Sequence, residues 1–159
     1  MKKLLLPLLM FCCFGCSNPT KTELLDYINN KITVASGWET KAIRAYDAVS
    51  GANYKNDSIM YLELQASVMP NYSAFCAELK KYESELKEPE LITLHKKYLE
   101  GANLQLKGFG LIQTALEKQD TAIIAEANGC LEKGRFLIKE WRSGLDSLCK
   151  KYDIVITKN

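Results

Sequence analysis

Histidine is nearly absent from this 159-residue chain, with His95 as its single example. Zinc sites draw on several histidine or cysteine ligands at short spacings, and the body of the chain after residue 16 has no CxxC pair. A di-iron bundle needs Glu-x-x-His twice and haem attachment needs CxxCH, and both are missing. We therefore expect no cofactor, and we interpret His95 as a packed or surface residue.

A surplus of charge of either sign is also missing. The net charge is +2, and because Lys2 and Lys3 lie in the N-terminal leader, the rest of the chain is formally neutral. Proteins that bind nucleic acid need clustered basic residues to release counterions. Here basic and acidic residues alternate, for example in residues 80–88, which is typical of solvated helix faces. We expect no nucleic acid partner.

Catalytic motifs and a disulfide framework are the remaining absences. Neither Gly-x-Ser-x-Gly nor a phosphate-binding loop occurs, and no nucleophile with its base can be named, so we expect a non-enzymatic protein. Three of the six cysteines lie before residue 17. The other three, Cys76, Cys130 and Cys149, are too widely spaced for a framework, and we expect them to be free thiols that pack as small apolar residues.

The N-terminus has the three parts of an export signal. Lys2 and Lys3 precede an apolar run of eleven residues, 4–14, and the small Gly15 follows. A membrane-spanning helix needs about 20 apolar residues, so this run is too short to be one. Residues 1–15 are therefore predicted to be a signal peptide.

The stretch Cys13-Phe14-Gly15-Cys16 resembles the lipobox of bacterial lipoproteins. The resemblance implies cleavage between Gly15 and Cys16, and a diacylglycerol group on the Cys16 thiol. Cys13 and Phe14 depart from the family pattern, which usually has Leu at the first position and a smaller residue at the second. Ser17 after the cysteine implies the periplasmic face of the outer membrane in a Gram-negative cell. The alternative is an ordinary secretory signal with an unmodified Cys16.

The rest of the chain divides into a lipidated tether, residues 16–21, and one helical domain, residues 22–159. Apolar spacing predicts helices over about 22–52 and 57–86, a third that opens at Pro89, and a fourth capped by Asp120 or Thr121 that runs to Tyr152. Pro70 predicts a kink or break near residues 67–71. These elements predict an all-α fold, a single up-down-up-down four-helix bundle.

Six glycines fall inside the third and fourth predicted helices, where each costs about 0.8–1 kcal/mol relative to alanine. They are Gly101, Gly108, Gly110, Gly129, Gly134 and Gly144. One interpretation is close approach of the two helices, or room beside Trp38 and Trp141. The other is a ligand cleft. The residues assigned to this packing contact or cleft are Gly101, Gly108, Gly134 and Trp141.

The run Pro89-Glu90-Leu91-x-x-Leu94-His95-x-x-Tyr98 resembles a pattern in helical-bundle lipoproteins of bacteria. This resemblance brings no activity or site residues with it. Our first hypothesis is a non-enzymatic binding or structural module in the cell envelope, held to the membrane by lipid on Cys16, with an envelope protein as partner. The alternative is a small-molecule or metal-sensing bundle with its ligand between the third and fourth helices.

Overall fold

The computed structural model describes residues 18–155, and this part of the chain is all-helical, without a β-strand. The α-helices are α1 (Pro19–Asp26), α2 (Thr33–Asp47), α3 (Asp57–Glu63), α4 (Met69–Glu83), α5 (Pro89–Lys118) and α6 (Thr121–Lys151). A π-helical segment η1 (Tyr27–Ile32) joins α1 to α2, another, η3 (Leu64–Val68), joins α3 to α4, and a 3₁₀ turn η2 (Gly51–Asn53) follows α2. The all-α prediction is confirmed. The predicted signal peptide, with Gly15 and Cys16, lies outside the described residues.

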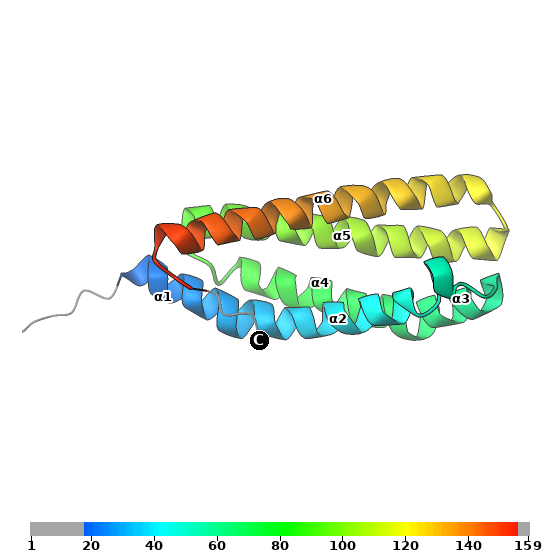
Figure 1. The fold of residues 1–159 in the computed structure, drawn as a ribbon, viewed down its shortest axis with the longest axis horizontal. Helices are drawn as coiled ribbons and strands as arrows, with labels where there is room; N and C mark the ends of the chain where they lie inside the picture. The colour runs from blue at the N-terminus through cyan, green and yellow to red at the C-terminus, as the bar shows by residue number, and fades with distance from the viewer. Residues whose placement is uncertain (1–17, 156–159) are drawn as a thin grey trace, which may run out of the picture.

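The helices form two layers along one long axis (Figure 1). In one layer α5 packs along α6, and in the other α2 packs along α4. The layers meet through α4 and α5 and through the side chains between them. No helix between residues 18 and 155 combines the length and apolarity needed to cross a membrane.

The first helix begins earlier than predicted. The side chain of Asn18 accepts hydrogen bonds from the backbone of Thr20 (3.1 Å) and Lys21 (3.4 Å), and Pro19 occupies the first turn. A capping asparagine followed by proline is a strong helix start. Residues 19–21 of the predicted tether, residues 16–21, are therefore helical.

Of the kink or break predicted near Pro70, the break does not occur. Helical backbone is continuous from Asp57 to Glu83, and Pro70 lies in the first turn of α4. In η3, just before it, the backbone N–H of Met69 bonds to the carbonyl of Leu64, five residues earlier. A π-helical turn widens the helix, which accommodates a residue that lacks a donor and carries a bulky ring.

Most residues of the apolar pattern that predicted the last two helices are buried. On α5 these are Leu91, Tyr98, Ala102, Gln105, Phe109 and Ile112, and on α6 they are Ala127, Leu131, Gly134, Ile138, Trp141, Leu145 and Leu148. The other residues of this apolar pattern, including Leu94 and Ile124, are partly buried against the same core.

Glycines bring α5 and α6 into backbone contact. A Cβ atom on Gly134 would lie 2.7 Å from the carbonyl oxygen of Gly101 and 2.6 Å from Cγ of Gln105. A Cβ on Gly101 would lie 2.9 Å from the Gly134 carbonyl, and one on Gly108 would lie 2.8 Å from Cγ of Leu131. The neighbouring helix thus fills the space beside these glycines, as the packing interpretation requires.

Replacement of Gly134 by alanine should destabilise the fold by about 1–3 kcal/mol, because the added methyl meets backbone that cannot move independently. Gly129 is the matched control in the same helix, since a Cβ there meets nothing within 4 Å. Gly129→Ala should instead stabilise by about 0.4–1 kcal/mol through helix propensity. Urea unfolding of both variants measures this, and effects of the same sign would contradict the packing interpretation.

Candidate functional site

The four residues assigned to a packing contact or cleft lie in two different environments. Gly101, Gly108 and Gly134 lie at the α5–α6 contact, whereas Trp141 is 5% exposed and its ring stacks on Tyr98 with a centroid distance of 3.8 Å. Trp141 therefore belongs to the layer of side chains between the two helical layers. The four do not surround a common space.

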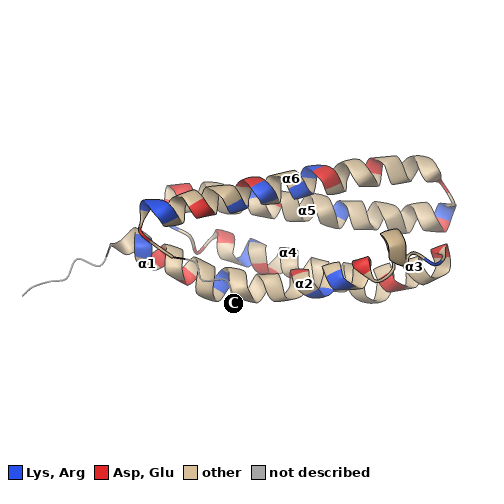
Figure 2. Ribbon diagram, in the orientation of Figure 1, with Lys and Arg blue, Asp and Glu red and all other residues tan. Residues whose placement is uncertain are grey.

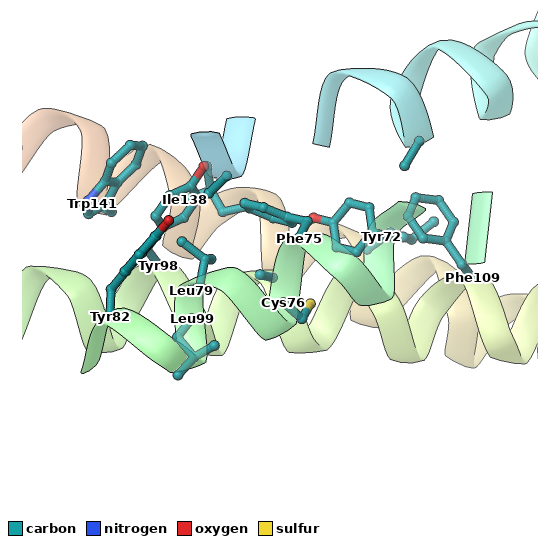
Figure 3. Close-up of a cluster of buried hydrophobic side chains, with 14 of the residues drawn as sticks. Tyr72, Phe75, Cys76, Leu79, Tyr82, Tyr98, Leu99, Phe109, Ile138 and Trp141 are labelled. Atoms are coloured by element: carbon teal, nitrogen blue, oxygen red, sulfur yellow. The ribbon is translucent and has the colours of Figure 1, made fainter. Parts of the chain in front are cut away.

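Aromatic rings fill much of the space between the layers. Figure 3 shows Trp141, Tyr98, Phe75, Tyr72 and Phe109 following one another along the bundle. Ring centroids are 5.5 Å apart from Tyr98 to Phe75, 5.2 Å from Phe75 to Tyr72 and 5.1 Å from Tyr72 to Phe109. Edge-on pairs of this kind contribute about 0.5–1.5 kcal/mol each beyond their buried area.

A chain of buried hydrogen bonds crosses this aromatic layer. His95 Nε2 lies 2.8 Å from the carbonyl oxygen of Leu79, and since a carbonyl only accepts, Nε2 donates. In the neutral ring Nδ1 then accepts from the hydroxyl of Tyr27, 3.1 Å away. The Tyr27 oxygen in turn accepts from Trp141 Nε1 at 3.2 Å. One set of proton positions satisfies every bond and links η1, α4, α5 and α6.

The buried network holds its groups in neutral forms. Burial lowers the pKa of His95, which its hydrogen bond to the Leu79 carbonyl opposes only in part. Burial also raises the pKa of the Tyr27 hydroxyl. His95 thus has a structural place in the core. Among residues 18–155, no group of three potential metal-ligating side chains is brought together.

A partly buried carboxylate lies beside the same rings. The hydroxyl of Tyr98 donates to Glu39 Oε2 at 3.1 Å, and burial raises the pKa of Glu39, against the lowering effects of this bond and of Arg142. The fully buried hydroxyl of Tyr72 has no partner in the described part of the chain. Burial raises the pKa of Cys76 to about 12, so this thiol stays protonated and is a poor nucleophile.

A pocket of about 570 Å³ opens where α5 ends and α6 begins, and we name it the tip pocket. Its volume lies in the range of small-molecule sites, about 300–1,000 Å³. Its apolar lining is Met60, Ile112, Ala115, Leu116 and Ile124, its aromatic lining is Tyr46 and Tyr54, and its polar lining is Asp57, Gln119, Asp120, Thr121 and Asn128. The row of core rings reaches the pocket, because Phe109 packs on Tyr46 of its lining, and the pocket begins at Ile112, one turn after Phe109 on α5.

Local turn chemistry shapes the tip pocket. Gln119 ends α5 in the left-handed conformation, with φ of 54°, and its N–H bonds to the carbonyl of Ala115. Asp120 then caps α6 by accepting from the N–H of Ala122 at 2.9 Å. This turn is too short to cover the end of the bundle. A smaller pocket of about 390 Å³ adjoins the tip pocket and shares Asp57, Leu116 and Gln119 with it.

The start of α1 lies at the opposite end of the molecule from the tip pocket (Figure 1). There Thr20 donates to Glu88 Oε2 at 2.9 Å, and Glu23 Oε1 accepts from the backbone N–H of Lys87 at 2.6 Å. Elsewhere Lys and Arg alternate with Asp and Glu along the helices (Figure 2). The tip pocket, remote from the N-terminal end, is the candidate functional site.

The first prediction from the site concerns His95, whose ring signals can be followed alone because the chain has one histidine. Its pKa in the folded protein lies below the ordinary 6.5, so below pH 6.5 the unfolded chain binds a proton that the folded chain does not. The free energy of unfolding should therefore fall as the pH drops below 6.5, until the folded pKa is reached. NMR should show unprotonated Nδ1 at pH 6.5. Half-protonation at that pH would contradict the network.

The second prediction from the site concerns Glu39, whose carboxylate is partly buried. Because its folded pKa is raised, the free energy of unfolding falls as the pH rises through that pKa. Glu39→Gln retains an acceptor for Tyr98 and should stabilise the protein by roughly 0.5–1 kcal/mol at pH 8 but not at pH 4. Glu132→Gln, on the exposed face of α6, is the control and should leave the free energy of unfolding unchanged at both pH values. An equal gain for Glu39→Gln at both pH values would rule out the charge as its cause.

Comparison with known proteins does not assign the chain to a family. No protein-family model matches it, and neither a curated protein nor a solved structure does. The function is therefore inferred from its own residues and their geometry.

Proposed function

We propose that this chain is a lipid-anchored protein of the bacterial envelope, an up-down-up-down four-helix bundle that carries a non-enzymatic binding site at the end remote from its lipid. The observation that carries the proposal is the separation of the two ends. Helix α1 begins at Pro19 at one end of the molecule, and the tip pocket lies at the other (Figure 1).

The anchor is the lipid that the lipobox resemblance implies on Cys16. Only Ser17 and Asn18 separate Cys16 from α1, and two residues span at most about 7 Å. Two or three acyl chains give stable attachment where one gives only marginal binding. The lipid would then hold the bundle by its α1 end, close to the headgroups.

The length of the bundle takes the tip pocket away from the bilayer. Helix α6 has 31 residues, which at about 1.5 Å per residue extend roughly 46 Å. A partner or ligand in the envelope space would therefore meet the tip pocket without contact with lipid.

The chemistry of the tip pocket favours binding over catalysis. Its lining offers carboxylates, hydroxyls, amides and aromatic faces over an apolar floor, which are groups that orient a ligand. His95 and Cys76 lie elsewhere, in the core. The alternative hypothesis of a ligand between the third and fourth helices draws support from the same pocket, because α5, α6 and their turn supply most of its lining.

The proposal predicts that lipid attachment depends on Cys16 and on no other cysteine of the leader. In bacteria fed an alkyne-tagged fatty acid, the natural chain and a Cys13→Ser variant should both be labelled and should sediment with membranes. Cys16→Ser should lose the label and leave the membrane fraction, because no other thiol occupies the acceptor position.

Mass spectrometry of the N-terminal peptide completes this test. An acylated Cys16 at the new N-terminus is the expected result. Cleavage at another bond, or a label that survives Cys16→Ser, would overturn the lipid-anchor proposal.

A further inference from the structure

We propose that the tip pocket binds a ligand in which an ammonium group is joined to an apolar body. This inference rests on the proposed binding role of that end of the bundle and adds the chemical class of the ligand. Three features of the pocket support it: an apolar floor, two carboxylates that form no ion pair with any residue in 18–155, and two aromatic side chains.

The floor of the tip pocket is apolar. Ile112 and Ala115 on α5 are each 3% exposed, Met60 on α3 is 9% exposed, and Leu116 and Ile124 are partly buried against the core. An apolar group placed there would be removed from water on every side except its outer one. Such burial contributes about 25 cal/mol per Å² of apolar surface. The floor therefore favours a hydrocarbon or aromatic body.

The rim of the tip pocket carries two carboxylates and no cationic side chain. Neither Asp57 nor Asp120 forms an ion pair with any residue in 18–155. The lysines nearest to them in sequence, Lys55 and Lys118, do not line the pocket. A ligand with positive charge would supply the counterion that the described protein does not.

Helix dipoles do not cancel this negative charge. Helices α3 and α6 begin at this end, and their positive ends face Asp57 and Asp120, but α2 and α5 finish at the same end with their negative carbonyl groups. Each helix end is worth about half a charge and acts within its own turn, so the beginnings of α3 and α6 offset only part of the full charge on each carboxylate. The two carboxylates remain as the net charge of the rim.

Aromatic faces complete an ammonium site. Tyr54 is 47% exposed, and its hydroxyl donates to Asp57 Oδ1 at 2.6 Å, which holds the ring beside the carboxylate. Tyr46 enters from α2, where its ring packs on Phe109 at a centroid distance of 4.9 Å. Aromatic faces attract ammonium groups through their quadrupoles, whereas an anionic ligand would meet two carboxylates. The pocket therefore selects by charge.

The test compares three probes with the same six-carbon tail: hexylamine, hexanol and hexanoate. Each is titrated by calorimetry into the lipidated protein in nanodiscs of zwitterionic lipid, with empty nanodiscs as the reference. Hexylamine should bind about tenfold more tightly than hexanol, a difference of about 1.4 kcal/mol, and hexanoate should bind most weakly.

Two variants identify the carboxylates responsible. Asp57→Asn and Asp120→Asn should each weaken hexylamine binding about threefold or more and leave hexanol binding unchanged. Asparagine caps helices as well as aspartate does, so Asp120→Asn should keep the cap of α6. Asp57 follows the cap Asn56 of α3, and asparagine there keeps an oxygen that accepts from Tyr54. The matched control is Asp146→Asn, at an exposed position near the other end of α6. It should leave the affinities for hexylamine and hexanol unchanged.

The possible failures are distinguishable. Equal affinity for the three probes, or hexylamine binding that both Asn variants leave intact, overturns the ammonium inference but leaves an apolar binding site at the tip. Binding of none of the probes overturns the inference and removes the binding role of this end. The lipid anchor is tested separately, by the label on Cys16.

Discussion

The backbone contact between α5 and α6 is the constraint on which the rest of the structure depends. Because Gly101 and Gly134 carry no side chain, the backbones of the two helices approach closely at these residues. Trp141 and Tyr98 stack between the two helical layers, and the row of rings continues to Phe109. Phe109 packs in turn on Tyr46, which lines the tip pocket. The close α5–α6 contact and the row of rings beside it thus lead to the lining of the tip pocket.

The hydrogen bonds of Tyr27 and His95 fix how the two layers are aligned. An apolar aromatic layer tolerates sliding, but a buried donor without an acceptor costs about 1–3 kcal/mol, so the layers have one favoured register. The network lies toward the α1 end of the bundle. The tip is held by short turns and by Asp120 as a cap, and among residues 18–155 it has no buried network of this kind.

Sequence patterns predicted the elements whose causes are local. The apolar stripes of α5 and α6, the start of α5 at Pro89 and the cap of α6 at Asp120 follow from residues within a few turns of one another. Of the kink or break predicted near Pro70, the break does not occur, because the π-helical turn η3 accommodates the proline. Helix α1 begins before the predicted residue 22 because Asn18 caps it. Tyr27 and Glu39 could not be predicted as partners of His95 and Tyr98, which lie 68 and 59 residues away. The positions of the glycines in the sequence indicated a helix contact or a cleft and could not distinguish the two. The tip pocket could not be predicted, because it forms only where the ends of four helices meet.

The central claim is that the anchored end and the binding end are opposite ends of one bundle that stands on the bilayer. Neutron reflectometry of the lipidated protein on a supported bilayer tests it most directly. Since α6 has 31 residues, the account predicts a protein layer that extends about 45 Å from the headgroups. A layer about 20 Å thick, the depth of two packed helix layers, would mean that the bundle lies flat against the lipid, and would contradict it.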